Sequence, residues 1–193
     1  MKIFIVLFLF SSGLCAQDFR DLKLFQEFNE KEKITSNIKL SDDSILLSVY
    51  WKHGFMDLTE IRHYIVSKNW EVKKIEESQS KGNTDMIYFK ETTMSDVEKS
   101  AFLIHFKKLL NSDFIQVELA AFIAFNPKVQ IQCMLDSDKE TRGIIVTQNK
   151  KQSKYEAYNP HQILQSCDLI HKEYLQEFVD LYSLFRFELK KFY

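Results

Sequence analysis

The sequence predicts an α+β fold in which antiparallel β-hairpins and a β-meander pack against helices, with a long C-terminal helix. Two patterns predict it: short runs in which apolar and polar residues alternate, and longer stretches whose apolar residues recur every three to four positions. The chain of 193 residues is 45% hydrophobic and 14% aromatic, which is enough for a packed core. Its only 4 glycines and 2 prolines leave no linker-like stretch. We therefore expect one domain over residues 17–193.

The N-terminus has the layout of a secretory signal peptide. Lys2 supplies a positive charge, Ile3–Phe10 is an unbroken apolar run, and small polar residues follow. Eight apolar residues form about 12 Å of helix, which is too short for a hydrocarbon core of roughly 30 Å. We expect residues 1–16 to direct export to the periplasm or the external medium, with no transmembrane segment.

Cys15 has three alternative fates. Ordinary signal-peptidase cleavage after Cys15 or after Ala16 discards it, a lipoprotein signal would make it a lipid anchor, and an uncleaved start would retain it. Leu14 stands where a lipoprotein signal has a small residue. We therefore expect plain export, with a membrane-tethered lipoprotein as the minor alternative.

The first half of the mature chain predicts one helix and then a meander of short strands. Phe19, Leu22, Phe25 and Phe28 recur at helical spacing. Alternating or β-branched runs follow, and the carboxylates Glu76 and Glu77 lie at the end of one of them, where we expect solvent. The expected strands are residues 45–53, 60–66, 70–77 and 86–90.

The second half predicts helices around a second hairpin. Ser95 and Glu98 have capping-box spacing before an apolar face, whose members are Val97, Ala101, Phe102, Phe106 and Leu109. Residues 114–125 fit a helix or a buried strand, and the expected strands are 129–135, 144–148 and 155–158. Asn159 and Pro160 predict the start of the last helix. Its apolar stripe, Leu164, Cys167, Ile170, Tyr174, Phe178, Leu181, Phe185 and Phe192, indicates one long helix or a break near Ser166.

Two cysteines remain in the mature chain, Cys133 and Cys167, each on the apolar face of its element. In an oxidising compartment they are candidates for a disulfide, which would stabilise the fold by about 3–4 kcal/mol. The alternative is two separate buried thiols.

No catalytic, cofactor or metal signature is assembled along the chain. His63, His105 and His171 are candidates for a general base, but no GxSxG or HExxH motif is present. Cys133, Cys167 and His171 would supply three ligands where a structural zinc site needs four. We therefore expect no metal, no cofactor and no catalytic residue.

Aromatic and apolar residues are the candidates for contact with a partner or ligand. Phe55 and Met56 lie at a hairpin tip, where polar residues are usual, and Trp51, Tyr64 and Trp70 are candidate pocket-lining residues. The 26 basic and 27 acidic residues give a net charge of −1, which lacks the basic excess of a nucleic-acid-binding protein.

The order of several segments resembles a group of small exported bacterial proteins of unassigned function. The segments are LLSVYWKHGF, EIRHYIV, NWEVKKIEE, FKKLLNSDF, GIIVTQ and SKYEAYNP, followed by a cysteine-led final helix. The resemblance covers about residues 45–185 and implies an exported α+β protein. It supplies no catalytic residues.

The sequence thus favours a non-catalytic exported or cell-envelope protein that acts by protein–protein contact or structural association, with another envelope protein as partner. One alternative is a module that binds a small lipid or glycan between sheet and helices. A second alternative is a hydrolase with a histidine base.

Overall fold

The computed structural model describes residues 22, 24, 26–27, 38–41, 43–53, 58–80, 86–113, 115 and 140–185. The predicted signal peptide with Cys15, the hairpin tip with Phe55 and Met56, the predicted strand 129–135 with Cys133, and nearly all of segment 114–125 lie outside these residues.

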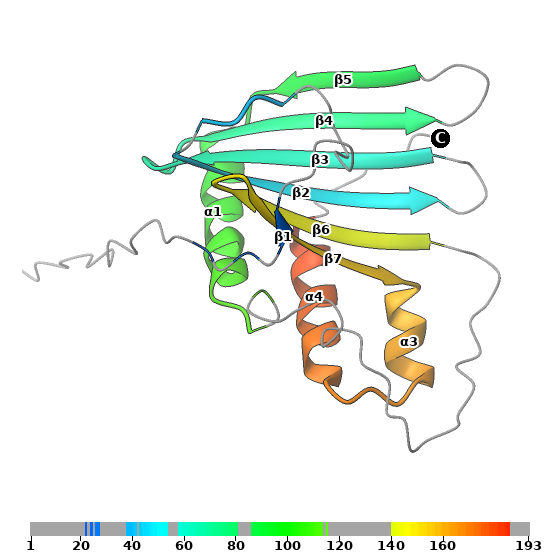
Figure 1. The fold of residues 1–193 in the computed structure, drawn as a ribbon. Helices are drawn as coiled ribbons and strands as arrows, with labels where there is room; N and C mark the ends of the chain where they lie inside the picture. The colour runs from blue at the N-terminus through cyan, green and yellow to red at the C-terminus, as the bar shows by residue number, and fades with distance from the viewer. Residues whose placement is uncertain are drawn as a thin grey trace, which may run out of the picture.

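In the part of the chain that the structure describes, a seven-stranded antiparallel sheet packs against three helices, which confirms the α+β class (Figure 1). The strand order is β1-β7-β6-β2-β3-β4-β5, and the helices lie together on one side of the sheet (Figure 1). The strands are β1 (Gln26–Glu27), β2 (Ser44–His53), β3 (Leu58–Ser67), β4 (Val72–Ser80), β5 (Met86–Thr92), β6 (Glu140–Gln148) and β7 (Lys151–Tyr158). The helices are α1 (Asp96–Leu110), α3 (Pro160–Ser166) and α4 (Lys172–Phe185).

On the central strand β2, Ile45, Leu47 and Val49 lie on one face and pack in the main core toward the helices. We call this side of the sheet the helix face and the other the opposite face. All residues from Ser44 to Tyr50 are buried, so both faces of β2 are covered. A strand that is buried on both sides needs apolar or hydrogen-bonded residues at every position, which explains its nearly continuous apolar run.

The second hairpin, β6–β7, turns through Asn149 and Lys150. Both residues have positive φ, 50° and 60°, as the two central positions of a type I′ turn require. Gln148 and Lys151 pair directly across the turn. β7 therefore begins earlier than the predicted strand at 155–158, because the tight turn allows pairing from its first residue.

β2 and β6 join the two halves of the chain into one sheet. Tyr50 lies directly opposite Gly143 in this pairing. A Cβ atom on Gly143 would lie 2.0 Å from the Tyr50 ring, so the aromatic ring occupies the space that any other side chain would fill. Tyr50 is 1% exposed and forms a small cluster with Ile61 and Ile145 on the opposite face.

α1 begins at the predicted capping box. The Glu98 amide donates to Ser95 Oγ at 3.3 Å, and the Ser95 amide donates to Glu98 Oε2 at 2.8 Å. Phe102, Phe106 and Leu109 are buried as expected. Val97 is 79% exposed, so its predicted place on the apolar face is wrong: it belongs to the first turn, which extends beyond the core.

The single long C-terminal helix is not confirmed. α3 ends at Ser166, Cys167 has extended backbone (φ −114°, ψ 146°), and α4 begins at Lys172. The break places Leu169 in the core and leaves Ile170 52% exposed, although the predicted stripe has Ile170 buried. The Asn159 side chain accepts a hydrogen bond from the Glu140 amide instead of capping α3.

The helix predicted around residues 19–28 is wrong where the structure describes it. Gln26 and Glu27 form β1, which pairs with Gln152 and Lys151 of β7. The Leu22 amide donates to Gln148 Oε1 at 2.8 Å, and Leu24 is buried. The edge of β7 offers backbone hydrogen bonds that the local apolar periodicity does not reveal.

Replacing Gly143 with alanine tests the close approach of Tyr50 and β6. We expect Gly143→Ala to lower the free energy of unfolding by about 1–3 kcal/mol, because the new methyl group overlaps a buried ring. Urea unfolding measures this loss. In a Tyr50→Ala background the same change has room and costs much less. Equal costs in both backgrounds would contradict the contact.

Candidate functional site

The predicted aromatic pocket is not formed by its three described members. Trp51 pairs with Glu60 near one end of the β2–β3 hairpin, and Trp70 follows the turn after Ser67 at the other. Roughly 20 Å of strand separates them at about 3.3 Å per residue. The Trp51 ring lies against the His53 ring in a tilted arrangement, with ring centroids 3.6 Å apart, and Lys107 Nζ lies 4.9 Å from the Trp70 ring centroid.

Tyr64 belongs to the core. It is 3% exposed, stacks on Phe102 with ring centroids 4.3 Å apart, and donates to the Phe185 carbonyl at 3.4 Å. Burial raises the pKa of Tyr64 to about 12, against a smaller lowering by Arg62. Its ring stabilises the packing of α1 and α4 on the sheet and has no surface left for a ligand.

The three histidines proposed as general bases lie on separate elements. His105 is on α1, where burial, assisted by Lys108, lowers its pKa. His171 precedes α4 and pairs with Glu173 at 3.3 Å on the surface. His63 differs from both, since it is 1% exposed and lies between two polar partners on the opposite face.

Ser48, His63 and Glu77 form a buried hydrogen-bonded chain across three neighbouring strands. Ser48 Oγ lies 2.8 Å from His63 Nδ1, and His63 Nε2 lies 3.2 Å from Glu77 Oε2. Gln79 donates to the other oxygen of Glu77. One tautomer satisfies every group: Nε2–H donates to the carboxylate, and Nδ1 accepts from the serine hydroxyl.

In this hydrogen-bonded chain a hydroxyl, a base and a carboxylate follow one another. Hydrolases use the same order of groups to activate a nucleophile. Ser48, His63 and Glu77 are only 3%, 1% and 4% exposed, so no substrate reaches the hydroxyl in this arrangement. The expected solvent exposure of Glu77 is therefore wrong. Glu77 pairs with Ile61, and His63 pairs with Ile75. The side chains of Glu77 and His63 therefore lie beside each other on the opposite face of the sheet. The only sequence signal for this was the two-residue spacing from Ile75, which places Glu77 on the same face of β4 as that apolar residue.

A second cluster on the opposite face surrounds Glu156. Its carboxylate accepts from the Tyr50 hydroxyl, from Lys52 Nζ at 2.9 Å and from Lys154 Nζ at 3.1 Å. Burial by itself would raise the pKa of Glu156, but these three partners outweigh it and lower the pKa to about 2. Burial and the Glu156 bond raise the pKa of Tyr50. The cluster ties the ends of β2 and β7 to each other across β6.

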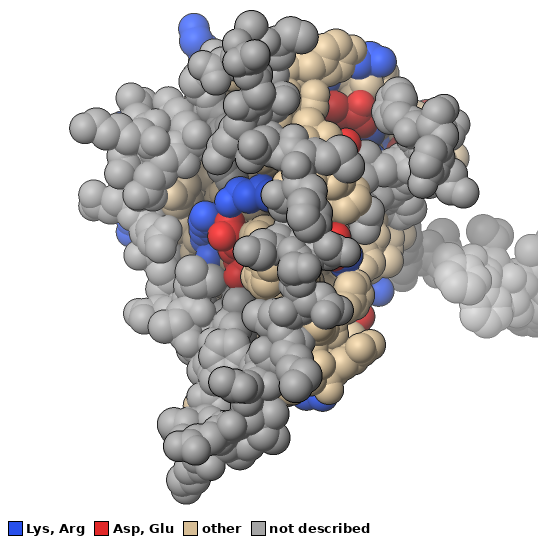
Figure 2. Space-filling model, turned by 90° about the vertical axis from the view of Figure 1, so that its right-hand side faces the viewer, with Lys and Arg blue, Asp and Glu red and all other residues tan. Residues whose placement is uncertain are grey.

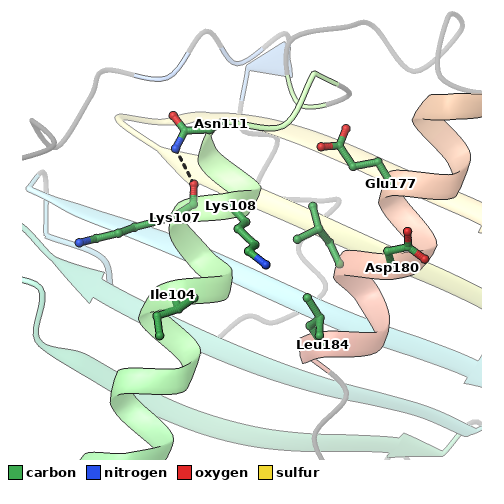
Figure 3. A pocket seen from close by; sticks show the side chains of 8 residues that line it. Ile104, Lys107, Lys108, Asn111, Glu177, Asp180 and Leu184 are labelled. Carbon is green, nitrogen blue, oxygen red and sulfur yellow. Dashed lines mark hydrogen bonds between the residues drawn. The ribbon is translucent and has the colours of Figure 1, made fainter.

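An open cleft of about 480 Å³ lies between α1 and α4 (Figure 3). Lys108 extends from α1 toward α4, which carries Glu177 and Asp180, and Ile104 and Leu184 add apolar surface (Figure 3). Gln176 donates to Asp180 at 2.9 Å. The cleft is shallow, and its charges have both signs, so it lacks the convergent polar groups of a ligand site.

On the edge strand β5, three large apolar side chains in succession are exposed. Ile87 is 50%, Tyr88 62% and Phe89 41% exposed. Among the described residues β5 pairs with β4 only, and it forms the outer edge of the sheet (Figure 1). Ile87 and Phe89 lie on the opposite face, since they pair with Gln79 and Glu77, whereas Tyr88 lies on the helix face.

Charged side chains are mixed in sign on the side of the molecule shown in Figure 2, where described acidic groups lie beside described basic groups. Over the part of the chain that the structure describes, no group of three metal-ligating side chains is present. The described helices also include none that is long and apolar enough to cross a membrane.

Cys167 is 6% exposed and packs in the main core. Its predicted partner, Cys133, lies outside the described residues, so the disulfide stays a prediction. No protein-family model and no curated protein matches the chain.

Glu156→Gln tests the ion cluster through the pH dependence of stability. The folded pKa of about 2 lies below the ordinary glutamate value of 4.5, so the stabilisation is present above pH 4.5 and is lost as pH falls toward 2. We expect the variant to be about 1–2 kcal/mol less stable at pH 7, after allowance for solvent screening, and nearly equal at pH 2.

Urea unfolding at several pH values measures this difference. Glu91→Gln is the matched control, because the Lys73–Glu91 pair is about half-exposed and should contribute less than about 0.5 kcal/mol. A loss for Glu156→Gln that is independent of pH would contradict the prediction.

Glu77→Ala tests whether the buried chain stabilises the sheet. The change leaves His63 without its acceptor inside the protein, so we expect a loss of about 2–4 kcal/mol in urea unfolding. Glu76→Ala is the control, because Glu76 is the next residue, faces the other side of the sheet and is 37% exposed. Equal losses of stability for the two variants would show that the Ser48–His63–Glu77 hydrogen bonds do not stabilise the sheet more than a surface carboxylate does.

Proposed function

We propose that this protein is a non-catalytic exported or cell-envelope protein that acts through protein–protein contact, and that the outer edge of β5 is its contact strand. The observation that carries the proposal is the exposure of Ile87, Tyr88 and Phe89 in succession on an edge strand. The signal-peptide pattern of residues 1–16 supports export, and an envelope protein is the expected partner.

An edge strand presents backbone N–H and C=O groups that a further strand can pair with. Proteins usually protect such edges with charges, proline, bulges or a covering segment. In β5 the three residues before Lys90 and Glu91 are large and apolar, and they lie on both faces of the strand. A partner strand would therefore gain backbone hydrogen bonds and bury side chains on both sides.

The other edge of the described sheet offers no comparable surface. The two-residue strand β1 pairs with Gln152 and Lys151 at the start of β7. Farther along β7, Lys154 is half-buried and pairs with Glu156. Apolar docking surface is thus concentrated at β5.

The ionisable groups support a non-catalytic role. The Ser48–His63–Glu77 chain is buried, and Glu156 is held by its own lysines and Tyr50. These groups satisfy one another instead of converging on the α1–α4 cleft, whose lining comes from other residues.

A photo-crosslinking amino acid in place of Tyr88 tests the contact strand in the exporting cell. We expect irradiation to give a discrete covalent product heavier than the single chain, because the Tyr88 side chain belongs to the edge strand and is 62% exposed. Immunoblotting of the cell envelope detects the product. Phe89→Lys, introduced together with the probe, should reduce its yield at least about tenfold.

The matched control carries the same probe at Val97, which is 79% exposed in the first turn of α1 and is not part of β5. A contact specific to β5 gives product from position 88 and not from position 97. No product at position 88, or equal yields at the two positions, would refute β5 as the contact strand.

A further inference from the structure

We propose that the strand that pairs with β5 is β5 of a second copy of this chain, in a symmetric antiparallel dimer. The inference rests on the proposed function, since it names the partner at the same edge. It follows from the order of residues along Met86–Thr92, which lets the strand pair with itself so that Phe89 faces Phe89, Lys90 faces Tyr88 and no like charges are opposed.

Only one symmetric register pairs all seven residues of β5, and it places Phe89 on the two-fold axis. In that register Phe89 faces Phe89 of the second copy, Tyr88 faces Lys90, and Ile87 faces Glu91. Directly opposite side chains in an antiparallel pair have Cβ atoms about 4.5–5.5 Å apart. The two exposed phenylalanines would therefore contact each other on the opposite face.

The charges of β5 are compatible with this register. Lys90 lies opposite the ring of Tyr88, where a cation–π contact is favourable, and this pair occurs twice by symmetry. Glu91 keeps its own partner, Lys73, at 2.7 Å, so pairing leaves no carboxylate without a counter-ion. Facing like charges are the usual obstacle to edge-to-edge pairing, and this register brings none together.

The dimer should be weak. A pair of seven-residue strands covers less than the roughly 1,600 Å² of a standard interface. We therefore expect weak association, with a Kd of about 10 μM.

Sedimentation equilibrium of the exported chain, from about 1 to about 200 μM, tests the dimer. We expect a reversible monomer–dimer equilibrium that Phe89→Lys weakens at least about tenfold, because it places two like charges at the two-fold axis. Val97→Lys, on exposed α1 surface, is the matched control and should leave the Kd unchanged. Circular dichroism confirms that both variants are folded.

Single cysteines test the register. Phe89→Cys should give a covalent dimer on mild oxidation, because position 89 faces itself across the axis. Ile87→Cys should not, since two copies of position 87 lie about 13 Å apart along the paired strands. The unsubstituted chain is the background control. A dimer that crosslinks through position 87 and not through position 89 overturns this register.

The outcomes separate the inference from the proposed function. A chain that stays monomeric at about 200 μM overturns the dimer. If the probe at position 88 then captures a different protein in the cell, β5 remains the contact strand, but its partner is not a second copy. If the probe captures nothing, the proposed function fails as well.

Discussion

The structure depends on the pairing of β2 with β6. These strands are far apart in the sequence, and their register from Leu46–Thr147 to His53–Glu140 joins the N-terminal meander to the C-terminal hairpin. Closing so long a loop costs conformational entropy. The cost is offset because both strands bury nearly every residue, with Ile45, Leu47, Ile144 and Val146 fully inside the main core. The helices have one continuous face to pack on only when this pairing exists.

The two faces of the sheet are stabilised by different interactions. The helix face is an apolar and aromatic core, in which Tyr64, Phe102 and Phe185 contact one another. The opposite face combines the buried Ser48–His63–Glu77 chain with the Glu156 cluster. If β2, β3 or β4 shifted its register by one residue, the side chain of Ser48, His63 or Glu77, respectively, would point into the apolar core. The polar chain therefore penalises wrong registers, whatever its net contribution to stability.

Burial decreases across the sheet from its centre to its outer edge. β2 is covered on both faces over Ser44–Tyr50, β3 alternates between buried and half-buried residues, and β5 is exposed from Ile87 to Glu91. Apolar side chains at the exposed end add nothing to the core of the single chain. A surface of this kind is typical of a strand that gains its packing from a partner, and for that reason we place the proposed contact at the edge of the sheet and not at its buried polar groups.

The sequence by itself determined what neighbouring residues along the chain can specify. The capping box of Ser95 and Glu98 starts α1, and the alternation around Ile45 and Leu47 gives β2 its core face. Such signals are local, since they depend on backbone hydrogen bonds and side-chain direction within a few residues. They were sufficient for the α+β class and for most strand positions.

Only the tertiary structure decided which side chains are covered. Glu77 is buried because its strand lies beside His63, Tyr64 is lost to the core because α1 and α4 pack on it, and Phe89 is exposed because β5 is last in the strand order. The apolar stripe of the C-terminal segment left open one long helix or a break near Ser166, and the structure has the break, with Leu169 in the core and Ile170 exposed. Burial depends on strand order and on contacts between residues distant in sequence, and the local pattern of a single segment carries no information about either.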